Sequence, residues 1–302
     1  MLGRLPPPRD GGPSILEVLE VPVHRIRLSE LLDAVAAAVR DQRRLTVMYL
    51  NVHVVNASVR VPALREALHR ADLVYCDGFG VRIGARLLGD TLPERMTGAD
   101  LLWDVAAVAE RRGLRVYWVG GSEGVAAAAL ERMRARYPAL RVAGAEHGYF
   151  ARQGPETEAV LERMRRARAD VVLVGMGTPA QELWVAEHRD AMAAPVVWCV
   201  GAAADFVSGR VRRAPPWMHR HALEWVFRLL LEPRRMFGRY VIGIPLFLAR
   251  VLWWRFRGRG ASRVNLTRSG LPILGMGVDA QPQHPDANVV DGNPRAGHNR
   301  SS

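Results

Sequence analysis

Four short apolar runs, each followed directly by glycine or another small residue or by Asp-Gly, limit the fold of this chain more than any other feature. They lie at 73–76, 116–119, 171–174 and 196–200, with stretches between them that are long enough to form helices. Such runs are typical of buried parallel strands. Strands separated by helices indicate a parallel sheet that is covered on both faces. The sequence therefore predicts an α/β fold.

The spacing of apolar residues and of helix stop signals predicts the individual elements. Strands are expected at 46–55, 72–76, 115–119, 140–145, 170–175 and 196–200, and helices at 30–40, 62–70, 79–88, 98–112, 123–136, 155–168 and 179–192. We expect a flexible leader at 1–14, the α/β core at 15–210, an Arg- and Trp-rich helical appendage at 211–257 and a disordered tail at 258–302. The tail is rich in Gly, Pro, Asn and Ser and lacks aromatic residues, which is typical of disorder.

Asp77 is the main candidate for a catalytic residue. It follows the run 73–76 and precedes Gly78-Phe79-Gly80. Open α/β sheets bind their ligands at the carboxyl ends of the strands, and among the four strand ends only this one begins with a carboxylate. The alternative is that Asp77 only caps the next helix, which is a common position for Asp.

Other polar residues follow the strands, and each has a structural alternative. Asn51 interrupts an apolar strand, where a buried amide must be hydrogen-bonded, either in a site or to the local backbone. Arg95 lies in a loop and could bind an anionic ligand or be solvated. Gln181 and Glu182 follow Gly177-Thr178-Pro179 and could belong to a site, or could form the first turn of a helix, where Pro and acidic residues are common.

The glycines at the strand ends allow a close approach of the backbone to a ligand. Residues 120–124 lack the GxGxxG spacing and the acidic residue that holds a ribose, so a nicotinamide fold is not favoured. The chain contains no lysine, which excludes a P-loop kinase. It also lacks Asp-x-Asp and any Cys/His cluster with metal-ligand spacing, so we expect no metal and no cofactor.

Positive charge is concentrated near the carboxyl end. Residues 208–259 hold twelve Arg against Glu224 and Glu232, so 12 − 2 gives +10 of the chain's net charge of +12. The same segment holds four Trp and the apolar stretch 242–248, which suits a helix lying in the headgroup plane of an anionic membrane. The alternatives are a helix packed on the core or on a neighbouring subunit, and a nucleic-acid arm, which the apolar stretch disfavours.

The compartment follows from three further observations. Cys76 and Cys199 lie in expected strands without a CxxC pair, which is typical of buried cysteines in a reducing compartment. The amino terminus has no apolar signal core, so we expect no export. No run reaches the roughly 20 apolar residues of a spanning helix; the best candidate, 241–254, carries Pro245 and Arg250.

Several ordered motifs between about residues 45 and 240 resemble those of the WecG/TagA/CpsF glycosyltransferases (glycosyltransferase family 26). They are Asn51; Asp77-Gly78-x-Gly80; Arg95-x-Thr97-Gly98-x-Asp100-Leu101; Gly175-x-Gly177-x-Pro179-x-Gln181-Glu182; Gly201-Ala202-x-x-Asp205-Phe206; Arg213-Ala214-Pro215; Leu223-Glu224-Trp225; and Glu232-Pro233-x-Arg235. The resemblance implies a Rossmann-like core with a C-terminal helical, membrane-associating appendage. It also implies inverting, metal-independent transfer of a sugar from a UDP-sugar to an undecaprenyl-diphosphate-linked saccharide at the cytoplasmic face of the cell membrane.

The resemblance assigns roles by position. It implies that Asp77 is the catalytic base with Asn51 beside it, that Arg95 binds the diphosphate and that Gln181 contacts substrate. One departure is that Tyr49-Leu50-Asn51-Val52 stands where the family often reads Thr-x-Asn-Pro. The full set of expected site residues is Asp77 and Asn51 for catalysis, and Arg95, Gln181, Glu182, Gly120, Gly121, Gly175, Gly177, Gly201, Asp205, Arg210 and Arg213 for substrate binding.

Chemistry agrees with this assignment. A single carboxylate that takes the acceptor's proton suffices for single-displacement inversion, whereas a retaining hydrolase needs two. Guanidinium groups from Arg95 and from Arg210, Arg212 or Arg213 could stabilise the leaving UDP. The alternative function is a non-catalytic nucleotide-sugar or dinucleotide binding module. The sequence leaves open the donor sugar (N-acetylmannosamine, its uronic acid or glucose), the acceptor saccharide and whether the chain forms a homo-oligomer.

Overall fold

A computed structural model describes residues 13–212, 214–215, 218, 224–258 and 263–264. Residues 1–12, 213, 216–217, 219–223, 259–262 and 265–302 lie outside the description. Nearly all of the expected leader, nearly all of the expected tail and the candidate Arg213 therefore lie outside the described residues.

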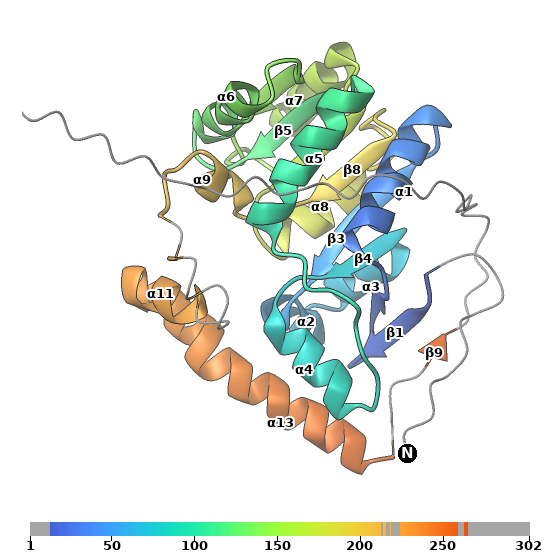
Figure 1. The fold of residues 1–302 in the computed structure, drawn as a ribbon, viewed down its shortest axis with the longest axis vertical. Helices are drawn as coiled ribbons and strands as arrows, with labels where there is room; N and C mark the ends of the chain where they lie inside the picture. The colour runs from blue at the N-terminus through green and yellow to red at the C-terminus, as the bar shows by residue number, and fades with distance from the viewer. Residues whose placement is uncertain (1–12, 213, 216–217, 219–223, 259–262, 265–302) are drawn as a thin grey trace, which may run out of the picture.

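A six-stranded parallel sheet forms the centre of the protein (Figure 1). Its strands are β3 (Leu45–Leu50), β4 (Leu73–Cys76), β5 (Arg115–Gly120), β6 (Arg141–Glu146), β7 (Val171–Gly175) and β8 (Val196–Cys199), in the order β4-β3-β8-β7-β5-β6. Every neighbouring pair is parallel. All residues of β3, β4, β7 and β8 are buried, as expected of strands covered on both faces. The predicted Rossmann-like α/β fold is confirmed.

Two groups of helices pack around the sheet. Among the described residues, the helices that precede the C-terminal segment are α1 (Leu28–Arg40), α2 (Val52–Arg60), α3 (Pro62–Arg70), α4 (Phe79–Leu87), α5 (Gly98–Arg112), α6 (Val125–Arg136), α7 (Pro155–Ala167), α8 (Ala180–His188) and α9 (Ala203–Val207). Helix α5 contacts α1 and α9, and α9 contacts α6, whereas α3 contacts α8. The sheet lies between these groups, with α1 and α5 in front of it in Figure 1.

Two predicted elements end early. The strand expected at 46–55 stops at Leu50, because Asn51 is the N-cap of helix α2. Val52, Val54 and Val55 favour a strand by propensity, but the cap and the packing of the helix prevail. The helix expected at 179–192 ends at His188.

A small antiparallel sheet was not predicted. It contains β1 (Ile15–Val18), β2 (Val21–His24) and β9 (Arg263–Val264), in the order β2-β1-β9. Leu19 and Glu20 connect β1 and β2 with φ values of 53° and 64°. Two-residue hairpin loops with positive φ usually contain Gly or Asn, so this pair gives no recognisable turn signal.

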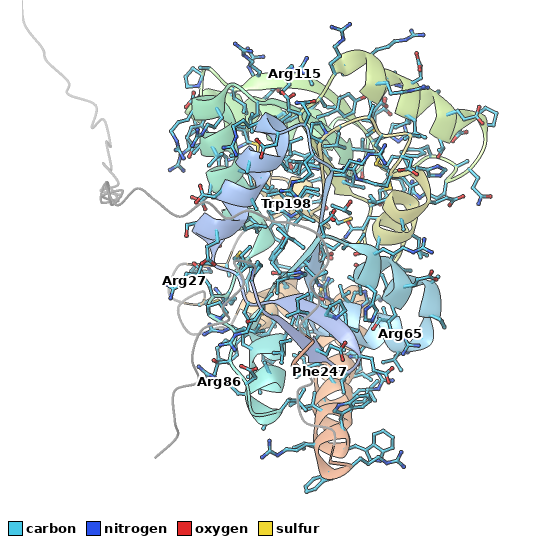
Figure 2. All side chains as sticks on the ribbon, turned by 90° about the vertical axis from the view of Figure 1, so that its right-hand side faces the viewer. Arg27, Arg65, Arg86, Arg115, Trp198 and Phe247 are labelled. Atoms are coloured by element: carbon cyan, nitrogen blue, oxygen red, sulfur yellow. The ribbon has the colours of Figure 1, made fainter. Side chains whose placement is uncertain are left out.

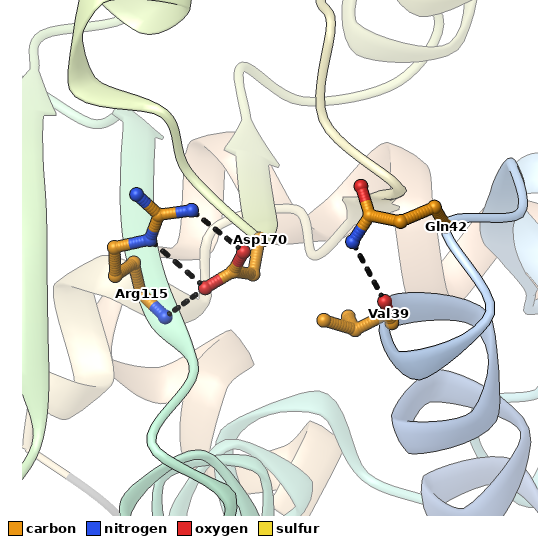
Figure 3. A network of polar contacts seen from close by, with 4 residues as sticks. All are labelled: Val39, Gln42, Arg115 and Asp170. Atoms are coloured by element: carbon orange, nitrogen blue, oxygen red, sulfur yellow. Dashed lines mark hydrogen bonds and ion pairs between the residues drawn. The ribbon is translucent and has the colours of Figure 1, made fainter.

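The amino edge of the main sheet is tied by charged side chains. Asp170, just before β7, accepts hydrogen bonds from the backbone N–H of Arg115 (2.7 Å) and from its Nε (3.1 Å) and Nη2 (3.0 Å), as Figure 3 shows. Asp72, just before β4, accepts a hydrogen bond from the backbone N–H of Thr46 (2.7 Å). The figure also shows Gln42 donating to the Val39 carbonyl at the end of α1.

The C-terminal segment folds back along the core. It contains α11 (Glu224–Leu231), α12 (Pro233–Met236), the π-helix η1 (Phe237–Ile242) and α13 (Gly243–Phe256). Helix α13 contacts α2 and α4, and Phe247, labelled in Figure 2, is fully buried there. A Cβ on Gly84 of α4 would lie only 2.5 Å from Phe247 Cζ, so glycine at this position allows the two helices to approach.

A buried amide fixes α13 to α2. Asn56 donates from Nδ2 to the Gly243 carbonyl (2.7 Å) and accepts from Arg250 Nη1 at Oδ1 (2.7 Å). The helical stretch Phe237–Phe256 is long and apolar enough to cross a membrane by length and composition, and 11% of its most apolar 18-residue window is buried. No spanning helix was expected, because the apolar run 241–254 is shorter than about 20 residues and carries Pro245 and Arg250. The helical stretch in the structure begins four residues earlier and ends two residues later.

Candidate active site

A cavity of about 540 Å³ opens at the carboxyl edge of the sheet, above β3 and β8. The chain leaves β3 toward α2 and β4, but it leaves β8 through α9, which contacts α6 on the other side of the sheet. Such a divergence between neighbouring strands creates the crevice where open α/β sheets bind ligands. Asn51 and Tyr49 from β3 and its end, and Val200 and Gly201 after β8, line the cavity.

Asp77 and Asn51 meet in this cavity. Asn51 donates from Nδ2 to Asp77 Oδ2 (3.1 Å) and accepts at Oδ1 from the backbone N–H of Val54 (3.1 Å). Both interpretations of Asn51 therefore hold, because the amide caps α2 and also holds the Asp77 carboxylate. The N-cap of α4 is Gly78, with φ of 96°, which suits glycine. Asp77 thus lies one residue before the cap and faces the cavity.

Arginines from two distant parts of the chain line the same cavity. Arg95 comes from the loop before α5, and Arg228 and Arg239 come from α11 and η1. Arg228 lies over the Phe206 ring (5.1 Å to the centroid), and its Nη1 donates to Tyr240 Oη (3.4 Å). Its Nε is buried without a partner. The guanidinium groups give this side of the cavity positive charge, which suits a diphosphate.

His53 also lines the cavity. Burial, followed by repulsion from Arg239 and Arg60, lowers its pKa to about 4. The imidazole is therefore neutral at pH 7 and does not add to the positive charge of the arginines. The sequence pattern did not select His53, because no other possible metal ligand lies at a suitable spacing from it.

Some of the other predicted substrate-binding residues line the cavity, and some do not. Gly177 and Gly201 line the cavity. Arg95 lines it too, so it is not a charge of the open surface. Gly120, Gly121, Gly175, Asp205 and Arg210 are not among the residues that line the cavity, and Arg213 lies outside the described residues. A binding role for these residues stays a prediction.

Close packing of backbones explains glycine at two of these strand ends. A Cβ on Gly120 would lie 2.3 Å from the Gly175 carbonyl oxygen, and a Cβ on Gly175 would lie 2.5 Å from the Gly201 carbonyl oxygen. The adjacent ends of β5, β7 and β8 therefore approach one another too closely for a side chain. Glycine at these positions allows two neighbouring strand ends to pack closely. A glycine that allows a ligand to approach the backbone would give the same sequence pattern.

Gln181 and Glu182 are fully buried behind the cavity wall. Gln181 donates from Nε2 to Tyr49 Oη (3.2 Å) and to Glu182 Oε1 (2.7 Å), and it accepts at Oε1 from the backbone N–H of Gly201 (3.0 Å). Thr178 Oγ1 also donates to Glu182 Oε1 (2.8 Å). Burial raises the pKa of Glu182 to about 7, although its hydrogen bonds with Gln181, with Thr178 and with its own backbone act in the opposite direction.

The described residues contain no group of three or more His, Cys, Asp or Glu side chains that could hold a metal ion. Metal independence stays a prediction that needs its own test.

An apolar outer face adjoins the cavity. Trp225, Tyr240 and Ile244 of the C-terminal segment line the cavity from one side. The same segment exposes large apolar side chains, namely Trp225, Leu230, Leu231, Phe237, Val241, Ile242, Leu252, Trp253 and Phe256, which we call the apolar face. Exposed apolar surface of this extent marks a site of interaction with a membrane or a protein.

Comparison with known proteins agrees with this geometry. The model of the "Glycosyl transferase WecG/TagA/CpsF family" matches residues 16–261. A relative from Bacillus spizizenii is 32% identical over 63% of this chain and 72% of its own length. Relatives from Bacillus subtilis and Staphylococcus aureus are each 28% identical, over 77% and 70% of this chain and 89% and 81% of their own lengths. All three are named N-acetylglucosaminyldiphosphoundecaprenol N-acetyl-beta-D-mannosaminyltransferase. The chain belongs to the WecG/TagA/CpsF family of glycosyltransferases.

Proposed function

We propose that the protein transfers a sugar, with inversion, from a UDP-sugar to a polyprenyl-diphosphate-linked saccharide during synthesis of a cell-surface polymer. The observation that carries this proposal is the cavity that holds the Asp77–Asn51 pair and Arg95, Arg228 and Arg239 together. The names of the relatives support N-acetylmannosamine as the first sugar to test and a diphosphoundecaprenol-linked N-acetylglucosamine as the first acceptor.

Asp77 acts as the general base in this proposal. An acceptor hydroxyl loses its proton as its oxygen attacks the anomeric carbon of the donor, and the carboxylate takes that proton. The bond from the anomeric carbon to the UDP oxygen breaks at the same time, so the configuration inverts. Asn51 donates to Asp77 Oδ2 and so fixes the direction of the carboxylate without neutralising its charge.

The arginines act on the leaving group. Negative charge grows on the UDP oxygens as the glycosidic bond breaks, and guanidinium groups directed at them stabilise the transition state more than the ground state. Arg95 belongs to the sheet region, while Arg228 and Arg239 belong to the C-terminal segment. The complete charge set therefore requires this segment to be docked on the core.

The apolar face supports action at a membrane. Apolar side chains of helices beside many arginines favour the interface of an anionic membrane, and this face lies beside the cavity. A lipid-linked acceptor held in the bilayer would then present its diphosphate and sugar to the cavity mouth. We place the protein at the inner face of the cell membrane as a peripheral protein.

A donor and acceptor screen tests the proposal. Full-length protein is incubated with UDP-N-acetylmannosamine, its uronic acid or UDP-glucose, with and without a diphosphopolyprenol-linked N-acetylglucosamine, and both UDP release and the glycolipid product are measured. We expect acceptor-dependent product in the presence of EDTA. Binding of a UDP-sugar without product would indicate a binding module, and loss of activity in EDTA that magnesium or manganese restores would contradict metal independence.

A further inference from the structure

Two hydroxyl groups on the cavity wall belong to a buried network that the proposed mechanism does not use. Tyr49 at the end of β3 and Thr178 after β7 line the cavity, and their hydroxyl oxygens lie 3.4 Å apart. Behind them, the fully buried Glu182 and Gln181 connect both hydroxyls through the hydrogen bonds described above. The network thereby joins the ends of three neighbouring strands, since Gln181 also holds Gly201 after β8.

The hydroxyl of Tyr49 is held in place from several sides. Gln181 Nε2 donates to it (3.2 Å), and a Cβ on Gly201 would lie 2.7 Å from it. Glycine at 201 therefore leaves the space that the phenol occupies. The ring of Tyr49 is nearly buried, so the part of it that faces the cavity is small and fixed in position.

One carboxylate oxygen of Glu182 accepts hydrogen bonds, and the other has no hydrogen-bond partner. Oε1 is bonded to both Thr178 and Gln181, whereas Oε2 is buried without a hydrogen-bond partner. The titratable groups that face Glu182 from the sheet are Tyr49 of β3 and Cys199 of β8. Burial raises the pKa of both groups well above neutrality, so both stay neutral.

Helices α3 and α7 and the loop before α7 all contact α8, and no arginine or histidine of these elements shifts the pKa of Glu182. On α3 the charged side chains pair at the surface, where Arg65 and His69 bind Glu20 and Arg70 binds Glu66. On the loop, Arg152 donates to the Gly148 carbonyl. A carboxylate that is buried without a cation favours its protonated form. The charge state of Glu182 therefore changes near neutral pH, where its pKa lies at about 7.

The direction of the Thr178 hydrogen bond depends on whether Oε1 of Glu182 carries a proton. When Glu182 is ionised, the Thr178 hydroxyl donates to Oε1, so it offers only lone pairs toward Tyr49 and the cavity. When Oε1 carries a proton, it donates to Thr178 Oγ1, and the Thr178 hydroxyl is then free to donate toward the cavity. One side chain can thus present either an acceptor or a donor at the same place.

We propose that the hydroxyls of Tyr49 and Thr178 form a specificity-determining contact with a hydroxyl or amide group of the transferred sugar, and that Glu182 is the positioning residue that sets whether Thr178 donates or accepts there. This inference rests on the proposed function, because it assumes that a sugar donor occupies the cavity. A site that hydrogen-bonds a substrate group discriminates strongly against analogues that lack it.

The test compares Thr178→Val, Tyr49→Phe and Glu182→Gln with the wild type. We expect Thr178→Val and Tyr49→Phe to raise the donor KM about threefold to tenfold, with a smaller change in kcat and an altered preference among UDP-sugars. UDP alone should bind equally well, because the hydroxyls contact the sugar. Thr178→Ser should restore the wild-type KM, and Ser58→Ala, which removes a buried hydroxyl on α2, should leave the KM unchanged.

The pH profile isolates Glu182. In the wild type the donor KM should change as pH passes through about 7, and in Glu182→Gln this change should be absent. The pH dependence of unfolding provides a second measurement. Because folding raises the pKa of Glu182, its contribution to stability is greatest below pH 4.5 and is lost as pH rises through about 7; the variant should not show this loss.

Two outcomes would overturn the inference alone: sugar transfer by the wild type with unchanged KM and sugar preference in both hydroxyl variants, or an unchanged pH profile of KM in a folded Glu182→Gln protein. If the wild type transferred no sugar from any UDP donor, the proposed function would fail first, and this inference with it. Should Glu182→Gln not fold, Thr178→Val and its rescue by Thr178→Ser decide the question.

Discussion

The two edges of the main sheet use carboxylates in opposite ways. At the amino edge, Asp170 accepts from a backbone N–H and from the Arg115 guanidinium, and Asp72 accepts from the backbone of β3. At the carboxyl edge, Asp77 accepts from the neutral amide of Asn51, and Glu182 keeps one oxygen without a partner. In Figure 2, Arg115 lies at the end of the molecule opposite α13. At the amino edge the carboxylates connect neighbouring strands, whereas at the carboxyl edge they lie at the cavity or directly behind its wall.

The largest effect should come from Asp77. Asp77→Asn keeps the shape of the side chain but removes the base, so we expect kcat to fall about 10²-fold to 10⁴-fold, while UDP binding and the folded state persist. Steady-state kinetics and UDP titration measure both. If a folded Asp77→Asn protein turned over substrate nearly as fast as the wild type, Asp77 would not be the general base. The two edges of the sheet would then not differ in the role of their carboxylates.

Arg95 should have the next largest effect. A charge-assisted hydrogen bond to phosphate contributes about 1.5–3 kcal/mol, so Arg95→Ala should reduce kcat/KM for the donor by about 10-fold to 150-fold. Arg65→Ala is the matched control, because Arg65 forms an ion pair with Glu20 in which both side chains are largely exposed, 40% and 48%. If the two variants had the same kcat/KM for the donor, Arg95 would be a solvated loop residue without a role in binding the diphosphate.

The apolar face should govern membrane binding. Trp253 and Phe256 are 53% and 85% exposed, so replacing both with Glu should leave the core intact and reduce co-sedimentation with anionic vesicles several-fold. Val142→Glu serves as the control, since Val142 is 37% exposed on β6 of the core. Binding of the wild type should also weaken at high salt, because each Arg near the surface contributes about 1 kcal/mol.

Removal of the segment completes this test. A chain truncated before Arg212 should lose both vesicle binding and most activity on a lipid-linked acceptor, because Arg228 and Arg239 are removed with the apolar face. If full-length and truncated proteins partition equally with vesicles, the apolar face instead packs in a protein interface, and an oligomer is the structure to look for.

The smallest effect on activity should come from the amino edge. Asp170→Ala leaves the backbone N–H of Arg115 without its acceptor, so the free energy of unfolding should fall by about 1–3 kcal/mol. Because this edge lies opposite the cavity, kcat and KM should stay within about twofold of the wild type. Denaturant unfolding and kinetics measure the two quantities, and a large loss of turnover in the folded variant would show that the edges are coupled.

The ends of the strands, and with them the position of Asp77, could be predicted from the sequence. Strands that are buried on both faces of a sheet are continuous apolar runs, and such runs are easy to recognise. The apolar runs that predict β4, β5, β7 and β8 begin and end within one residue of the strands in the structure. The Asn51–Asp77 contact also follows from the order of strands, since β3 and β4 are neighbours in the sheet. Glycine was less informative, because close packing between Gly120, Gly175 and Gly201 produces the same pattern as a ligand site.

The far wall of the cavity could not be predicted. Arg228 and Arg239 reach it only because α13 docks on α2 and α4, and this docking depends on single residues such as Gly84, Asn56 and Phe247. Contacts between single residues that are far apart in the chain produce no periodic pattern, so the docking of α13 could not be predicted from the sequence. From the sequence, Arg210, Arg212 or Arg213 at the start of the segment could supply the late guanidinium groups, and their role stays a prediction.

The docking of α13 on α2 has a consequence for when the enzyme becomes active. Ribosomes make the amino-terminal part of a chain first, and domains begin to fold during synthesis. A nascent chain that has folded its sheet would already hold Asp77, Asn51 and Arg95, but Arg228 and Arg239 would not yet be in place. In the proposed mechanism, activity would therefore begin only once α13 has docked on α2, where Asn56 hydrogen-bonds to Gly243 and Arg250. By the same logic, removing the chain that follows α9 would take away one wall of the cavity in a protein whose sheet is still intact.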